Sequence, residues 1–63
     1  MTDTITPLLL RPEEAAQSLG IGRTKIYELI RTGALRSVRI GALRRVPASA
    51  LTEFVTHLEE DAA

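Results

Sequence analysis

The middle of this 63-residue sequence concentrates basic side chains, a type that binds anions such as phosphates. Residues 23–45 hold seven Lys and Arg against one acid, Glu28, for a net charge of +6. Residues 46–63 hold four acids and no Lys or Arg, for a net charge of −4. The chain as a whole is neutral, but a basic segment of this density is typical of a nucleic-acid-binding surface. The alternative is a solvated surface on which the arginines cluster by chance.

Each residue type in the basic segment has a counterpart on duplex DNA. In a major groove, Arg and Lys suit guanine, Glu accepts a hydrogen bond from cytosine, and a Thr methyl group packs on thymine. A Tyr hydroxyl and a helix N-terminus suit phosphate, and arginines on a hairpin can enter the adjacent minor groove. The candidate DNA-binding residues are Arg23, Thr24, Lys25, Tyr27, Glu28, Arg31, Arg39, Arg44 and Arg45.

Two of these assignments have a simpler alternative. Glu28 can pair with Lys25 or Arg31 along one helix instead of contacting a base. The arginines between residues 39 and 45 can serve only to keep an exposed hairpin soluble. The sequence leaves both alternatives open.

The sequence offers no catalytic site, and we expect neither a metal nor a cofactor. There is no Cys, His57 is the only His and has no second ligand near it, and Ser49 and Thr52 have no base beside them. A chain of this length has one small core and no room for a cleft of ordinary size. The apolar run Leu8–Leu10 is too short for a signal peptide or a membrane span, so we expect a cytoplasmic protein without membrane contact.

A first helix is predicted immediately before the basic segment. Pro12 suits the first helical position, because its fixed φ matches the helix and its missing N–H has no helical partner there. Glu13 and Glu14 add favourable negative charge to the first turn. The helix is therefore predicted over residues 12–19, with Gly20 as its left-handed cap.

A second helix is predicted over residues 23–32, closed by Gly33. The turn between the two helices is Gly-Ile-Gly, and its Ile21 is expected to be buried. Two helices joined by a short turn that contains Gly match a helix-turn-helix. The inward-facing residues at helical spacing are Ile26, Leu29 and Ile30.

A hairpin and a third helix are predicted to follow. Residues 37–40 alternate as a strand does, residues 41–42 form a turn, and residues 43–46 return as the second strand. Pro47 is expected to end that strand and to open the third helix. The residues expected to face the core are Val38, Ile40 and Val46 from the hairpin, and Leu51, Phe54, Val55 and Leu58 from the helix.

These elements predict an α+β fold, a small winged helix-turn-helix with a two-stranded hairpin wing and a C-terminal helix. The chain is expected to form one domain over residues 1–63, with an ordered core at about 8–58. Leu8–Leu10 is expected to form a short strand or an extended lead-in. Residues 1–6 are expected to fray, and the acidic tail from Glu59 to be loose.

The sequence resembles the excisionase-type helix-turn-helix family, which is related to the DNA-binding domain of mercury-resistance (MerR) type regulators. The resemblance covers nearly the whole chain, from Leu8 to about Leu58. It implies a non-catalytic recombination directionality factor of phage or plasmid type, which binds and bends duplex DNA and helps an integrase in excision. It also implies that the second helix faces the major groove and the wing arginines the minor groove. The matching segments are residues 10–16, 19–21, 24–35, 38–41 and 45–51.

Three residues depart from the family pattern. The family usually has Thr or Ser in place of Arg11 and Ser in place of Gly22, both at helix N-cap positions, where Arg is a poor cap and Gly only a fair one. Leu43 lies near the wing tip, where the family often has Arg, Lys or Gly. This leucine either tucks under the hairpin or touches a neighbouring protomer on DNA.

Two other functions compete with excision. One is a small MerR-like transcription regulator, although the chain ends after the third helix, where such activators continue into a dimerisation helix. The other is a protein-interaction module whose acidic third helix docks on an integrase or polymerase. A DNA-binding module of this size buries only about 600–1,000 Å². We therefore expect cooperative self-association at adjacent DNA sites.

Overall fold

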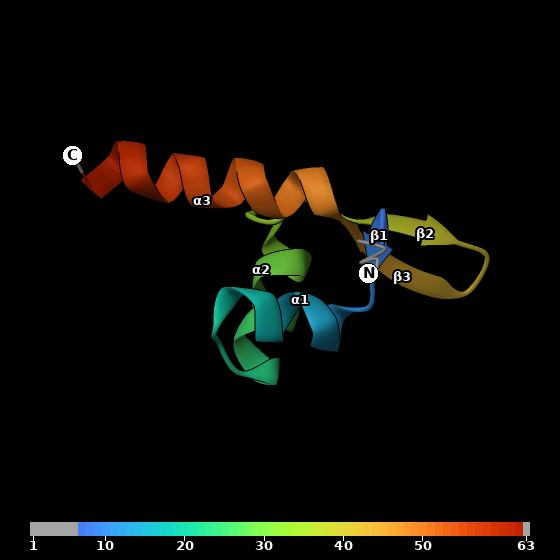
Figure 1. Ribbon diagram of the computed structural model, residues 1–63. Coiled ribbons are helices and arrows are strands. Elements are labelled where there is room, and N and C mark those ends of the chain that lie inside the picture. Colours follow the sequence, from blue (N-terminus) through green and yellow to red (C-terminus); the bar gives the residue numbers. More distant parts are fainter. Residues whose placement is uncertain (1–6, 63) are drawn as a thin grey trace, which may run out of the picture.

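The computed structural model describes residues 7–62 as three helices and a small antiparallel sheet. The expected fraying of residues 1–6 lies outside the described residues. The predicted α+β winged helix-turn-helix is confirmed (Figure 1). In chain order the elements are β1 (Leu9–Leu10), α1 (Pro12–Leu19), α2 (Arg23–Thr32), β2 (Val38–Ile40), β3 (Leu43–Pro47) and α3 (Ala48–Ala62).

The helix-turn-helix has the predicted boundaries, because its glycines end both helices. Gly20 (φ +72°) and Gly33 (φ +83°) adopt the left-handed conformation that residues with a Cβ rarely adopt. At the start of α1, the Glu14 carboxylate accepts a hydrogen bond of 2.9 Å from the backbone N–H of Arg11. Ile21, expected to be buried in the turn, is half-buried. The sequence thus carried enough local information to define both helices.

The sheet has one strand more than the predicted hairpin. Its strand order is β1-β3-β2, and β1 pairs with the end of β3 through Leu9 opposite Pro47 and Leu10 opposite Val46. Pro47 therefore ends β3 as its last residue, and Ala48 opens α3. The backbone N–H of Ala48 donates to the carbonyl of Leu8 at 2.9 Å. Of the two alternatives for the N-terminal leucines, the short strand is confirmed, and it anchors the wing to the body.

The prediction that Val38, Ile40 and Val46 share the core face is wrong. The register places Val38 opposite Arg45 and Ile40 opposite Leu43, and directly opposed residues of an antiparallel pair share a face. Because side chains alternate along a strand, Val46 lies on the other face from all four. It is fully buried, whereas the Ile40 side chain is 54% exposed. An alternation of apolar and polar residues shows that a short strand has two different faces. It does not show which of the two faces the rest of the protein covers.

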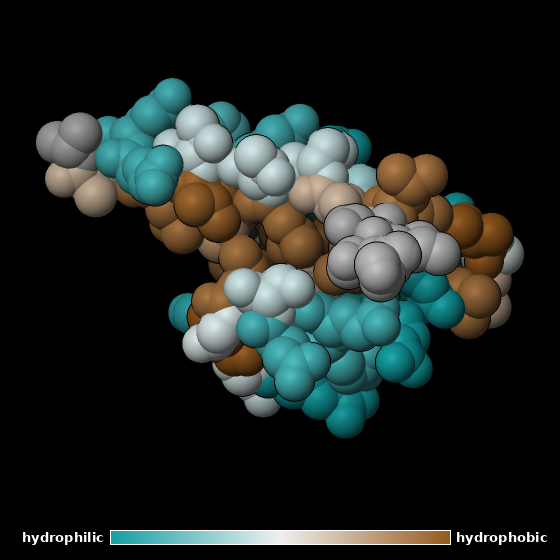
Figure 2. Space-filling model, in the orientation of Figure 1, coloured by the Kyte–Doolittle hydropathy of each residue, from teal (hydrophilic) through white to brown (hydrophobic). Residues whose placement is uncertain are grey.

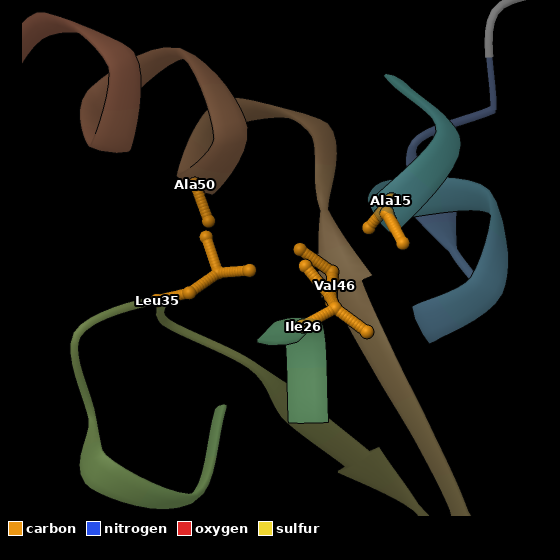
Figure 3. Close-up of a cluster of buried hydrophobic side chains, with 6 residues drawn as sticks. Ala15, Ile26, Leu35, Val46 and Ala50 are labelled. Carbon is orange, nitrogen blue, oxygen red and sulfur yellow. The ribbon is translucent and has the colours of Figure 1, made fainter. Parts of the chain in front are cut away.

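The core lies where α1, α2, β3 and the start of α3 meet. Ile26, Leu35 and Val46 are the largest fully buried side chains in the described part of the chain. In Figure 3 the side chains of Ile26 and Val46 meet at the centre, and Leu35 points toward Ala50. Leu35 and Ala50 were absent from the predicted core, because neither belongs to the apolar period used to find it.

The predictions for α3 are wrong in two respects. Its apolar stripe is not all core, because the side chains of Val55 and Leu58 are 40% and 52% exposed. Its acidic end is not a loose tail, because the helix continues through Glu59 to Ala62. Figure 1 gives the reason: the C-terminal half of α3 extends past the helix-turn-helix, which covers only the first half.

Candidate nucleic-acid interface

One face of α2 carries the first six candidate residues, and all six are exposed. The opposite face holds α2 against the body through the fully buried Ile26, with Leu29 and Ile30 half-buried beside it. The polar residues are therefore presented to solvent by a helix whose apolar side is fixed. They are Arg23, Thr24, Lys25, Tyr27, Glu28 and Arg31.

An open groove of about 1,100 Å³ runs along this face of α2 and reaches the wing. Its wing residue is Arg44, which β3 brings next to a helix that lies more than ten positions earlier in the chain. The sequence predicted that wing and helix would both face DNA, and the fold brings them to one groove. The lining residues are Arg23, Thr24, Tyr27, Glu28, Ile30, Arg31 and Arg44.

The three wing arginines do not form a single set. Arg39 and Arg44 are paired across the strands, so both lie on the Val46 face, toward α2. Arg45 lies on the other face opposite Val38 and is half-buried. Its guanidinium donates to the carbonyl of Arg44 at 2.9 Å. Register thus places Arg45 on the opposite face of the sheet from Arg39 and Arg44, and of these three only Arg44 lines the groove.

Glu13 is a residue of this site that sequence reasoning missed. One of its carboxylate oxygens, Oε2, accepts a hydrogen bond of 3.0 Å from the Tyr27 hydroxyl and lies 3.6 Å from a guanidinium nitrogen of Arg23. That guanidinium also lies 5.7 Å from the centre of the Tyr27 ring, a cation–π distance. The sequence analysis gave Glu13 a role only in the first turn of α1, because nothing local shows that this turn meets the start of α2.

The contacts of Glu13 stabilise its charged form. The pKa of the Glu13 carboxyl lies below its ordinary value, first because its own backbone N–H donates to it and second because the Tyr27 hydroxyl does. The positive charges of Arg23 and Arg11 lower the pKa further. Near neutral pH, Glu13 is therefore an anion held against two candidate phosphate-binding side chains.

The remaining ion pairs show which basic side chains already contact an acid within the protein and which can contact a ligand. Lys25 lies 3.5 Å from Glu28, so the intrahelical pair that competed with base contact is formed. Arg36 pairs with Glu53 of α3 at 3.3 Å and donates to the Ser49 hydroxyl, which directs it away from the groove. Within residues 7–62, Arg31 makes no ion pair. Arg31 is therefore available to a ligand in the groove.

Residues 7–62 contain no group of three or more His, Asp or Glu side chains arranged to hold a metal ion. None of the helices in this part of the chain is long and apolar enough to cross a membrane.

Comparisons with known proteins show the family of the chain. Residues 9–58 match the family model described as a helix-turn-helix domain. The chain is 46% identical to an excisionase of Streptomyces ambofaciens over 52 residues, which are 82% of this chain and 84% of that protein. It is 51% identical to a probable excisionase of Saccharopolyspora erythraea over 51 residues, 81% of this chain but only 52% of that protein. The chain thus spans about half the length of the second relative, and no solved structure matches it.

Proposed function

This chain belongs to the helix-turn-helix domain family and is related to excisionases, and from that premise we propose that it binds a duplex attachment site, bends it and assists an integrase in excision without catalysing strand exchange itself. The observation that carries the proposal is the groove in which exposed side chains of α2 and Arg44 of the wing converge. A groove lined by three arginines and one acid is typical of a surface that binds duplex DNA.

In the proposed complex, α2 enters the major groove of the duplex. That groove is about 12 Å wide and admits a helix of about 10–12 Å diameter. Thr24, Glu28 and Arg31 meet base edges, while Arg23, Lys25 and Tyr27 meet phosphates or flanking bases. For Arg23 and Tyr27, a DNA phosphate takes the place that the Glu13 carboxylate occupies in the free protein.

The wing extends the contact into the neighbouring minor groove. Arg39 and Arg44, on the α2 side of the sheet, are the residues positioned to enter it. Arg45 is on the far side of the sheet and contacts at most a flanking phosphate. Narrow minor grooves concentrate negative potential, so arginine entry favours A·T-rich flanks and bent DNA.

Cooperative self-association on DNA is part of the proposal. The far side of the wing exposes two large apolar side chains, Ile40 at 54% and Leu43 at 53%. Leu43 thus does not tuck under the hairpin, and contact with a neighbouring protomer is the remaining alternative. A single module buries too little surface for tight binding, so adjacent copies add affinity through this face.

Footprinting and titration on the cognate attachment region test the proposal. We expect protection of repeated sites, with log affinity falling against log salt at a slope near −0.9 per phosphate contact. An Ile40→Ser/Leu43→Ser variant should lose cooperativity between adjacent sites and keep its affinity for a single site. A random duplex of the same length is the control. No binding at micromolar protein in low salt contradicts the DNA-binding proposal.

The role in excision needs a separate assay, because a small transcription regulator of the same fold also binds DNA. With the partner integrase and a plasmid that carries both attachment sites, adding the protein should raise the yield of excised product. Protection confined to promoter DNA, with no effect on excision, favours the regulator.

A further inference from the structure

The outer half of α3 presents an apolar seam that the body of the protein does not cover. The seam follows Leu51, Val55, Leu58 and Ala62, which are spaced four, three and four residues apart. This is the a/d spacing of a coiled-coil heptad. Leu51 is half-buried and the other three are exposed. Figure 2 shows the corresponding band of apolar colour along the side of α3 that faces the helix-turn-helix.

Two residues of the seam, Leu51 and Val55, form one wall of a groove of about 420 Å³ together with Thr52, Thr56 and Glu59. The other wall is the end of α1, where Ser18 and Leu19 lie across from Leu51 and Val55. A groove between two helices that has both apolar and polar lining residues is a site into which an amphipathic helix can pack. The two-stranded wing of another copy of the chain fits this groove less well. The side chains of a strand repeat every two residues, so they do not match the holes between the side chains of a heptad seam.

The charges beside the seam indicate what kind of helix fits. With Val55 and Ala62 at a positions, Glu59 and Asp61 occupy the flanking e and g positions. Positions e and g set partner choice, and in the outer turns of α3 both are acidic. A second copy of α3 contains no Lys or Arg, so it offers no opposite charge to these acids. A helix with Lys or Arg at its e and g positions would find opposite charge on both sides of the seam.

DNA is a poor occupant for the same reason. The whole of α3 contains four acids and no Lys or Arg, so the phosphate backbone is repelled from it. The charge of the chain therefore assigns different ligands to the two surfaces: an anion to the groove beside α2 and a cation to the seam on α3.

We propose that the α3 seam binds a basic amphipathic helix of a partner protein, with aliphatic residues at its a and d positions and Lys or Arg at e and g. This inference stands independently of DNA binding, because the two surfaces share no lining residue. A protein that held both ligands at once would attach a second protein to a DNA site.

The test uses the full chain and a labelled synthetic peptide of about 21 residues, long enough to form a helix. The peptide carries Leu at a and d and Lys at e and g, and a scrambled peptide of the same composition is its control. Fluorescence anisotropy should show saturable binding of the heptad peptide only. A Val55→Ser/Leu58→Ser variant should bind it roughly tenfold or more weakly, since both substitutions remove apolar contacts at the centre of the seam.

Charge and control variants complete the experiment. Glu59→Lys/Asp61→Lys should weaken binding of the Lys peptide and strengthen binding of a matched peptide with Glu at e and g. His57→Ala, on the solvent side of α3, should change neither. The Val55→Ser/Leu58→Ser and His57→Ala variants, which leave the acids of α3 in place, should keep wild-type affinity for duplex DNA, which separates failure of this inference from failure of the DNA-binding function.

Three results would overturn the inference. The first is equal binding of the scrambled and heptad peptides, which leaves only non-specific charge attraction. The second is unchanged peptide affinity in the Val55→Ser/Leu58→Ser variant. The third is a dimer in sedimentation without peptide that this variant abolishes, because the occupant of the seam is then a second copy of the chain.

Discussion

The helices α2 and α3 both show apolar residues at helical spacing, but the fold uses them in opposite ways. In α2 the apolar side is covered, with Ile26 fully buried, and the charged side remains free. In the outer half of α3 the apolar side is free, with Leu58 about half exposed, and acids flank it. A hydrophobic period therefore identifies a surface that is stabilised when another apolar surface covers it. It does not say whether that partner is the rest of the domain or another molecule.

The largest test of this comparison removes one apolar side chain from each helix. Ile26→Ala should lower the free energy of unfolding by about 2–5 kcal/mol, because it leaves a cavity in the centre of the core. Leu58→Ala should change it by less than about 0.5 kcal/mol, because the side chain is exposed. Urea denaturation measures both. Equal losses would mean that the outer half of α3 belongs to the core.

The second test concerns the wing arginines on the two faces of the sheet. Arg44→Ala should cost about 1–3 kcal/mol of DNA-binding free energy, since this side chain lines the groove beside α2. Arg45→Ala removes the same charge from the far face and should cost clearly less. Anisotropy titrations at fixed salt give both values. A larger effect for Arg45 would reverse the assignment of the wing faces.

A third, smaller test is the start of α1. Arg11 sits at the N-cap without a capping side-chain bond, and its ion pair with Glu14, 3.7 Å long and exposed, adds little. Arg11→Thr should raise the free energy of unfolding by roughly 0.5–1 kcal/mol. Thermal denaturation measures the gain, and no rise in midpoint contradicts a helix that begins here. A parallel loss of DNA affinity would reveal a phosphate contact from Arg11.

The smallest expected effect is a pH dependence at Glu13, next to α2. Because the pKa of its carboxyl is lowered in the folded protein, Glu13 stabilises the fold at pH values above its ordinary pKa. That contribution is lost as the pH falls through the lowered value. The difference in thermal midpoint between the wild type and Glu13→Gln should therefore be constant near neutral pH and shrink in acid. A difference that grows in acid contradicts the sign.

Local signals explain which elements were predictable. Pro12, Gly20 and Gly33 act through their own backbone preferences, so both helices of the helix-turn-helix were predicted with correct ends. The exposed residues of α2 were also predictable, because the helical spacing of its apolar residues defines which side of the helix is buried. The faces of the wing did not, because the apolar residues of β2 and β3 fall on both sides of the hairpin and only the strand register decides which side is covered.

The sequence by itself determined the winged helix-turn-helix, the basic face of α2 and the separation of acid into the last helix, because caps, periodicity and charge are local or compositional properties. Only the tertiary structure decided that Glu13 contacts Arg23 and Tyr27. It also decided that Arg44, and not Arg45, lines the groove beside α2. The exposed part of the apolar stripe on α3 follows from the same packing. Each of these depends on which distant segments meet. Because the body of such a small domain covers only the first half of α3, the rest of the apolar stripe on this helix remains exposed and can contact a partner.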